Sequence, residues 1–358
     1  MPPRRGRGPA RAGSPIHQGL VGERVLVGSP YLADPDLRRA YGAEIAPRTT
    51  IALAKILAEV YGTTGRGHKP ETAPRRVLDL GAGTGAAGDA ARAFFGAFVG
   101  AQIEVVSVDR VAGPGGPTPG VLTADLVAPG ALAAVCGPLD RKFDLILAAH
   151  LLNELFVAVR APERTLARAQ KVRDWCETLL APEGIMVIVE PALRETSREL
   201  LAVRDRLLEA GLRVIAPCLW TGPCPALARE RDWCHDAAAG DSQGPGQRAR
   251  RVDFSYLALR AAGEPRSGAP DAGAADPALF RIVSDALVDK GRLRFFGCGP
   301  SGRDALVRLN RHRTAANLAF DRLARGDLAR IAQAAQAGDG RRIGAETIVE
   351  NLTQVPAE

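Results

Sequence analysis

Four cysteines in the second half of the chain have the side chains and spacing of metal or cluster ligands. They are Cys218, Cys224, Cys234 and Cys298, and prolines or glycines border three of them. Four soft thiolates suit zinc or an iron–sulfur cluster. Structural zinc prefers cysteine pairs about two to four residues apart, whereas five and nine residues separate the first three cysteines here. This wide spacing favours a [4Fe–4S] cluster, with zinc or four unligated thiols as the alternatives.

The neighbours of these cysteines suggest further roles. His235 directly follows Cys234, so it is a candidate replacement ligand, a hydrogen-bond partner of a sulfur atom or a packing residue. The remaining cysteines, Cys136 and Cys176, fall in apolar or helical patterns and are interpreted as core thiols. The chain begins without the apolar stretch of a secretory signal, so we expect reduced thiols and no disulfide framework.

A glycine-rich turn near residue 80 has the pattern of a cofactor-binding loop. An apolar segment runs into it as Val77-Leu78-Asp79-Leu80-Gly81-Ala82-Gly83-Thr84-Gly85. Glycines let backbone approach a ligand closely, and the N-terminus of the next helix favours polar ligands. A dinucleotide fold requires G-x-G-x-x-G, whereas these glycines are evenly spaced. The loop is similar to the S-adenosylmethionine loop of Rossmann-like methyltransferases; the alternative is a tight turn that binds nothing.

Two acidic residues after later strands extend this candidate site. Asp109 closes the second predicted strand, where an acid accepts hydrogen bonds from both hydroxyls of a ribose. Asp125 follows the third predicted strand and matches the position that often contacts the adenine amine in the methyltransferases that the loop resembles. The predicted cofactor-binding residues are Asp79, Gly81, Ala82, Gly83, Gly85, Asp109 and Asp125.

Candidate catalytic residues lie at the end of the fourth predicted strand. His150, Asn153 and Glu154 occur there, at the edge where ligands bind in such sheets. His150 could act as a general base or as a capping or packing residue. The Asn/Asp-Pro-Pro-aromatic motif of base N-methyltransferases does not occur at this point, so the sequence leaves open whether the protein is an enzyme.

These residues need a sheet with helices between its strands. Alternating periods predict a doubly wound, mainly parallel sheet of seven strands with intervening helices. The predicted strands are 76–80, 103–108, 121–124, 143–149, 185–189, 212–216 and 254–260, and the helices are 86–98, 166–180 and 196–210. The predicted fold class is therefore α/β, and the resemblance of the glycine loop implies a Rossmann-like class I S-adenosylmethionine methyltransferase fold.

The chain outside this sheet divides into three further regions. Residues 1–22 are interpreted as a disordered basic tail and 23–74 as two helices, broken near Pro47, followed by a linker. The methyltransferase-like domain covers 75–260, with a cysteine-bearing loop at 217–252. Residues 261–358 are expected to form a hairpin around Asp289-Lys290-Gly291 and a basic helix over about 303–332.

The composition narrows the function classes. The 358 residues carry a formal net charge of +7, and 42 of the 47 basic residues are arginine. A basic excess favours nucleic acid or another anionic partner. No apolar run approaches the ~18 residues of a membrane helix. We expect a bacterial cytoplasmic protein, monomeric off its partner; the acid-poor N-terminus leaves a mitochondrial transit peptide, and hence the matrix, as the alternative.

Several motifs in order identify a family. Asp79–Gly85 is followed by His150-Leu-Leu-Asn-Glu-Leu, by Glu190-Pro191, by the cysteine block and by Phe254-Ser-Tyr-Leu. Together they closely resemble the methyltransferase-like ribosome assembly factors of the mitochondrial small subunit and their bacterial homologues, over about residues 30–325. The resemblance implies a [4Fe–4S] cluster held by Cys218, Cys224, Cys234 and Cys298, and contact with small-subunit rRNA during assembly or translation.

The resemblance leaves three functions open. The first is an S-adenosylmethionine-binding, cluster-containing rRNA-binding protein; the others are an active RNA or protein methyltransferase, and a zinc-stabilised RNA-binding module with a vestigial cofactor loop. For the first function, the cluster is expected to order an RNA-binding face, with a solvated basic helix as the alternative for its C-terminal part. Arginines form this face. They are Arg229, Arg231, Arg248, Arg250, Arg251, Arg303, Arg308, Arg311, Arg313 and Arg322.

Overall fold

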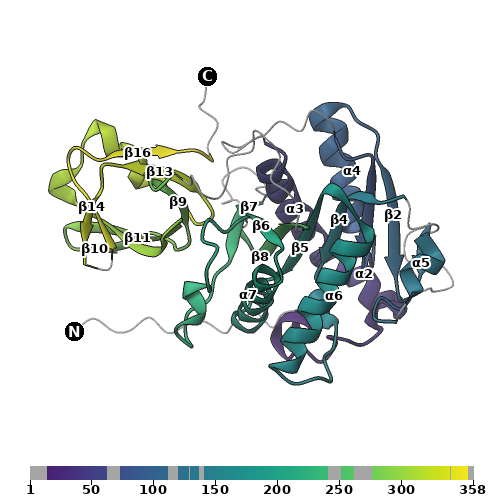
Figure 1. Ribbon diagram of the computed structural model, residues 1–358. Coiled ribbons are helices and arrows are strands. Elements are labelled where there is room, and N and C mark those ends of the chain that lie inside the picture. Colours follow the sequence, from purple (N-terminus) through teal and green to yellow (C-terminus); the bar gives the residue numbers. More distant parts are fainter. Residues whose placement is uncertain are drawn as a thin grey trace.

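The computed structural model describes residues 14–62, 73–111, 120–128, 130–136, 141–240, 251–261, 276–338 and 340–353. In these ranges the chain forms two domains, a sheet covered by helices and a smaller β domain at the left of Figure 1. No helix in the described ranges combines the length and apolar character needed to cross a membrane.

The larger domain is built on a mixed sheet with the strand order β3-β2-β1-β4-β5-β8-β6 and with β7 beside β8. Strands β1 to β5 are parallel, and β8 runs antiparallel to β5 and β6. The strands are β1 Arg76–Leu80, β2 Glu104–Asp109, β3 Val121–Thr123, β4 Phe143–Ala149, β5 Leu180–Pro191, β6 Arg213–Ala216, β7 Asp236–Ala239 and β8 Arg251–Arg260. The α/β prediction is confirmed, but the described residues form eight strands in this sheet, because β7 pairs with β8 where the sequence predicted a loop.

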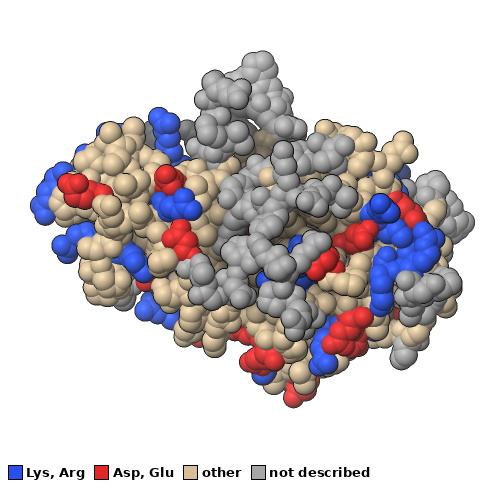
Figure 2. All heavy atoms as spheres, turned by 45° about the horizontal axis from the view of Figure 1, so that its top comes forward, with Lys and Arg blue, Asp and Glu red and all other residues tan. Residues whose placement is uncertain are grey.

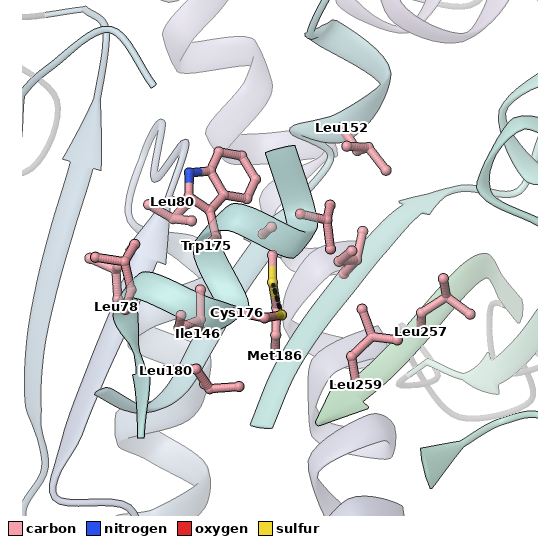
Figure 3. Packing of buried hydrophobic residues seen from close by; sticks show 14 of the residues in the cluster. Leu78, Leu80, Ile146, Leu152, Trp175, Cys176, Leu180, Met186, Leu257 and Leu259 are labelled. Carbon is pink, nitrogen blue, oxygen red and sulfur yellow. Dashed lines mark hydrogen bonds between the residues drawn. The ribbon is translucent and has the colours of Figure 1, made fainter. Parts of the chain in front are cut away.

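Helices cover both faces of this sheet. They are α3 Ala46–Val60 and α4 Ala86–Val99 on one face, and α6 Glu163–Leu179 and α7 Arg194–Glu209 on the other, with the short α5 Ala131–Cys136 near β3. Figure 3 shows the core on the α6 side, where Cys176 Sγ lies 3.6 Å from Met186 Sδ. Burial raises the pKa of Cys176 to about 12, in agreement with its interpretation as a core thiol.

The N-terminal region is more ordered than the sequence predicted. Residues 14–22 form two helical turns, α1 Pro15–His17 and η1 Gln18–Gly22, so the proposed tail of 1–22 is wrong over this part; residues 1–13 lie outside the described ranges. Ile16 is fully buried in a small apolar cluster with residues of η2 Tyr31–Ala33 and α2 Pro35–Glu44. One apolar side chain therefore anchors a segment whose composition is otherwise that of a tail. The predicted break between two helices is confirmed at Ile45.

The C-terminal region forms a domain of short strands, so the predicted basic helix is wrong. Residues 303–332 form strands and 3₁₀ turns instead of a basic helix. The elements are β9 Leu279–Ile282, β10 Leu287–Asp289, β11 Arg292–Gly299, β12 Gly302–Leu309, η6 Asn310–His312, η7 Ala315–Arg322, β13 Leu328–Ala332, β14 Ala335–Ala337, β15 Gly340–Ile343 and β16 Ile348–Asn351. Ala, Leu and Arg favour helix weakly, and pairing of β12 with β11 and β15 overrides that preference. The predicted hairpin is confirmed, since Asp289 pairs with Arg292.

Strands β9 to β16 close into a barrel. Their order is β14-β15-β12-β11-β9-β13-β16. Because β13 leads into β14, and β15 into β16, the two ends of this path belong to one hairpin, and the sheet closes on itself. The interior is packed with Phe280, Phe295, Leu306, Phe320 and Ile343, which are all fully buried. The barrel is thus a domain with its own core.

Candidate functional site

The four cysteines predicted as ligands line one cavity. Cys218 lies just beyond β6, Cys224 caps η4 Pro225–Leu227, Cys234 precedes β7 and Cys298 lies near the end of β11. The cavity has a volume of about 510 Å³ and opens between the two domains. Three cysteines therefore come from the methyltransferase-like domain and the fourth comes from the barrel.

Buried polar contacts hold the first cysteine loop in place. The side chain of Arg204 is 1% exposed, and its Nη1 donates to Gly222 O at 2.6 Å while its Nη2 donates to Trp220 O. Asp205 accepts a hydrogen bond from the backbone N of Cys224 at 3.0 Å. Helix α7 thus supplies both charges that shape the turn between Cys218 and Cys224.

Burial raises the pKa of all four thiols. The pKa of Cys224 is raised to about 11 and that of Cys298 to about 12, and those of Cys218 and Cys234 are also raised. The neighbouring thiols also disfavour one another's ionisation. Nearby Arg204 acts in the opposite direction on Cys218, Cys224 and Cys298. Without a cation among them, the thiols are protonated at neutral pH.

Across the described residues, no three His, Cys, Asp or Glu side chains lie close enough together to hold a single metal ion. Four thiolates are the donor set that a [4Fe–4S] cluster takes, and all four cysteines line this cavity. His235 also lines the cavity, with its ring stacked on Trp233 at 4.2 Å between centroids. Burial lowers the pKa of His235 to about 4, so the ring is neutral.

Buried and half-buried arginines join the two domains around this cavity. Arg281 of β9 is 4% exposed; it pairs with Glu59 of α3 and donates from Nε to Pro217 O at 3.3 Å. Arg303 of β12 pairs with Asp232 at 2.6 Å. Arg281 could not be identified from the sequence, because nothing local distinguishes it from the many other arginines.

The glycine loop has the geometry of a cofactor loop. Gly81, Gly83 and Gly85 all have positive φ, at 67°, 55° and 85°, which other residues adopt at a cost. Asp109 Oδ2 accepts from Gly83 N at 2.8 Å, so the acid at the end of β2 touches the loop. The structure therefore brings the ends of β1 and β2 together as the sequence predicted.

The other acids of this site differ in exposure. Asp79 is 1% exposed, its Oδ2 accepts from Gly88 N at 2.9 Å, and burial raises its pKa to about 7. Asp79 thus braces the start of α4. Asp125 is exposed beyond β3, next to Ala124, whose backbone N donates to Asp109 O. Ala82 lies between the two glycines and is buried.

The N-terminal region covers this loop. A Cβ added at Gly83 would lie 3.1 Å from Cδ1 of Leu32, and one added at Gly81 would lie 2.8 Å from Cδ1 of Leu151. Arg110 donates to the carbonyl oxygen of Ser29. A ligand placed against both glycines therefore takes the space of these leucine side chains, and the segment around Leu32 must move to admit it.

The three candidate catalytic residues lie together at the end of β4. His150 Nε2 lies 3.1 Å from Thr49 Oγ1, and burial lowers its pKa to about 4. Asn153 and Glu154 belong to η3 Leu152–Glu154. Glu154 accepts from Tyr31 at 3.1 Å, and burial raises its pKa to about 7. The carboxyl group of Glu154, which ionises near neutrality, suits proton transfer, whereas the imidazole of His150 with its lowered pKa is a weak base.

Further hydrogen bonds hold Asn153 and the backbone around it in place. Asn153 N donates to Glu190 Oε1 at 3.2 Å, and Asn153 Oδ1 accepts from Arg24 at 3.2 Å. The other oxygen of Glu190 is buried without a hydrogen-bond partner among the described residues. Glu190 was noted in the sequence only as part of a family motif, and Arg24 and Tyr31 were missed, because their roles depend on how the N-terminal region folds back.

The predicted basic face does not form as one surface. Arg308 is 2% exposed and bound to Asp321 and Asn317 inside the barrel, so it cannot contact RNA. Arg303 is engaged by Asp232, and Arg251 by Asp285 at 2.7 Å. Positions 248 and 250 lie outside the described residues. The prediction of one basic face was wrong because residues 302–309 form strand β12, whose inner face buries Arg308.

Structural neighbours are methyltransferases at low similarity. One is the plantazolicin methyltransferase BamL (13% identity, 52% of this chain and 73% of that chain, TM-score 0.36). Others are the DhpI–SAH complex (18%, 70% and 98%, 0.32) and a putative RNA methyltransferase from Pyrococcus horikoshii (13%, 59% and 82%, 0.31). No curated protein matches the chain significantly.

A family model gives the stronger comparison. The model described as mitochondrial small ribosomal subunit Rsm22 matches residues 131–341, which is more than half of the chain and spans β4 to β15. The match includes all four cysteines that line the cavity. The chain belongs to the Rsm22 family.

Proposed function

We propose that the protein binds S-adenosylmethionine and a [4Fe–4S] cluster, and that it acts on the small ribosomal subunit by contacting its rRNA during assembly or translation. The convergence of four cysteines from separate segments on one cavity carries the proposal. Membership of a family named for a small ribosomal subunit supports the partner.

The cysteine cavity suits a cluster that stabilises the domain arrangement. Cys218, Cys224, Cys234 and Cys298 would hold it, and the group would supply covalent cross-links between loops and barrel. Thiols with raised pKa must lose their protons on loading, so binding releases protons and depends on pH. The guanidinium groups of Arg204 and Arg303 lie where they offset the negative charge of four thiolates.

The glycine loop suits the cofactor of a methyltransferase. The even spacing of three left-handed glycines and the bond from Gly83 N to Asp109 support a nucleoside with its ribose at Asp109. Asp125 is exposed next to Ala124, and we infer that it contacts the base. The glycines carry no side chains, so the backbone would allow a close approach once the segment around Leu32 has moved. The cofactor would supply a methyl group.

The cluster is tested on protein purified without oxygen. We expect iron, sulfide and the visible absorption of an iron–sulfur cluster in the native chain, and loss of all three in Cys218→Ser and Cys234→Ser. Cys136→Ser, outside the cavity, is the matched control. One zinc per chain and no iron would support the zinc-stabilised alternative instead.

An active methyltransferase is the second candidate, favoured by His150 and Glu154 at the end of β4. Isothermal titration with S-adenosylmethionine tests binding, and Asp109→Ala is expected to weaken it. Transfer of a tritiated methyl group to naked rRNA and to assembly intermediates tests catalysis. Transfer abolished by Glu154→Gln with binding retained would establish an enzyme; binding without transfer supports the assembly role.

A further inference from the structure

The barrel has the strand order of an oligonucleotide-binding fold. The barrel has five arms, which in chain order are β9, β11, β12, the bent arm β13–β14 and the bent arm β15–β16. Around the barrel their order is β9, β11, β12, β15–β16 and β13–β14, that is, first, second, third, fifth and fourth. The third and fifth arms, β12 and β15, are parallel, and the short helix η7 lies between the third and fourth. This is the five-stranded Greek-key arrangement of the OB-fold, whose second and third strands present the ligand face.

The outer face of β11 and β12 has the side chains of such a ligand face. Residues paired across the strands share a face, so Arg294 stands beside Val307, and Phe296 beside Ala305. Inward residues of the same strands fill the core. Phe296 is only partly buried, which is unusual for an aromatic ring on a strand with a packed inner face.

Positive charge surrounds the Phe296 ring. The guanidinium carbons of Arg294 and Arg303 lie 5.7 and 5.6 Å from its centroid. Beyond Val307, the parallel strand β15 places the exposed Arg342 on the same face. Among the described residues, neither Arg294 nor Arg342 forms an ion pair with a carboxylate, so both charges are available to a ligand.

Small side chains leave room next to the ring. Ala305 pairs with Phe296 on one side and with Gly340 on the other, so the row across the three strands is Phe–Ala–Gly. Neither small residue is long enough to cover the ring. A flat aromatic platform flanked by arginines is the arrangement with which single-stranded nucleic acid is bound, by stacking of bases and attraction of phosphates.

The charge of the barrel agrees with a polyanionic ligand. Residues 277–353 contain thirteen Lys or Arg and eight Asp or Glu, a surplus of five positive charges. Figure 2 shows more basic than acidic side chains on the visible side of this domain, at the left. The surplus attracts phosphates without selecting a sequence.

We propose that the outer face of β11, β12 and β15 binds unpaired RNA nucleotides, with a base stacked on Phe296 and phosphates at Arg294 and Arg342. This deepens the proposed function and depends on it for RNA as the ligand. Phe296 and Arg303 also line the cysteine cavity. The inner end of the face therefore lies beside the cluster site, and the cluster would hold it against the larger domain.

The test uses the full chain with its cluster content measured. Fluorescence anisotropy compares a labelled oligouridine with an RNA duplex of the same length over a range of salt concentrations. Phe296→Ala is expected to weaken oligouridine binding about 5- to 150-fold, the loss of one base stack. Arg294→Gln and Arg342→Gln should each lower the salt slope by about 0.7 for each phosphate that the variant no longer neutralises. Arg330→Gln, on β13, removes the same charge from another wall of the barrel and should change little.

The outcomes separate this inference from the proposed function. If the native chain binds small subunits while Phe296→Ala and the Arg294→Gln/Arg342→Gln double variant bind oligouridine like the native chain, the face is not the RNA site and the inference fails alone. If these variants lose subunit binding but keep oligouridine binding, the face contacts a protein, which also overturns the inference. If the native chain binds neither RNA nor subunits, the proposed function itself fails. The double variant keeps Phe296, so it tests the face even if Phe296→Ala loses its cluster.

Discussion

The buried ion pair between Arg281 and Glu59 should set the position of the barrel against the larger domain. The side chains are 5% and 9% exposed. Arg281 Nη1 also donates to Gly326 O at 2.6 Å, and Glu59 accepts from Tyr256 at 2.8 Å. In Arg281→Met, the buried Glu59 carboxylate keeps one hydrogen-bond donor, Tyr256. The carbonyl oxygens of Pro217 and Gly326 lose the donor that Arg281 supplied.

Breaking a buried pair by removing one partner costs about 3–5 kcal/mol. We expect the free energy of unfolding to fall by this amount. Urea denaturation, monitored by circular dichroism and tryptophan fluorescence, measures it. The second variant, Glu59→Gln with Arg281→Met, should recover part of the loss, because no uncompensated charge then remains; the coupling energy from the full cycle should be about 1–3 kcal/mol.

The same pair should control the cysteine cavity, because Arg281 Nε donates to Pro217 O next to Cys218. Arg281→Met is therefore expected to lower iron content as well as stability. The matched control is Arg330→Met, an arginine 48% exposed on the adjacent strand, which should change stability by less than about 0.5 kcal/mol. A loss below about 1 kcal/mol in Arg281→Met, or a coupling near zero, would refute the reasoning.

Three further changes test separate parts of the molecule. Burial raises the pKa of Glu154 from 4.5 to about 7, so the native state binds this proton more tightly than the unfolded state does. The resulting stabilisation is complete below pH 4.5 and is lost as the pH rises through 7. Between pH 5 and pH 8, the free energy of unfolding of Glu154→Gln should therefore rise by up to about 3 kcal/mol relative to that of the native chain, as measured by urea unfolding at both pH values. Arg308→Met should cost about 3 kcal/mol, because Asp321 keeps some exposure, yet leave RNA affinity unchanged in anisotropy titrations. Leu32→Ala should tighten S-adenosylmethionine binding in calorimetry, whereas Ile45→Ala, in the same apolar cluster, should not; equal affinities would show that the cover does not compete with the cofactor.

The larger domain could be predicted because its local signals and its tertiary structure agree. Strand β4 was predicted at its observed bounds, and α4 to within one residue, since buried parallel strands are continuous apolar runs and their helices are amphipathic. The grouping of Asp79, Asp109 and Glu154 followed from the rule that the carboxyl ends of parallel strands share one edge. The cysteines were identified by residue type, although only the structure shows that Cys298 reaches them from another domain.

The barrel could not be predicted from the same signals. Its strands are short, and their alternation is hidden because Arg308 occupies an inward position that a pattern of polar and apolar residues assigns to the surface. Its buried guanidinium is compensated by Asp321 and Asn317, which lie nine to thirteen residues later in the chain. The N-terminal cover was missed for a similar reason, because Ile16 and Leu32 are isolated apolar residues whose burial depends on distant partners.

The distribution of charge links the two halves of the proposed function. Four of the seven surplus positive charges are the arginines of residues 1–11, and the barrel alone carries a surplus of five. The rest of the chain is therefore slightly acidic, and the methyltransferase-like domain has no net charge with which to attract RNA. Of the two domains, only the barrel then attracts RNA by its net charge, while the larger domain holds three of the four cysteines and the glycine loop. A group that joins Cys298 to those three cysteines would fix the RNA-attracting domain in one orientation, so the state of the cysteine cavity should determine how the chain meets the ribosomal subunit.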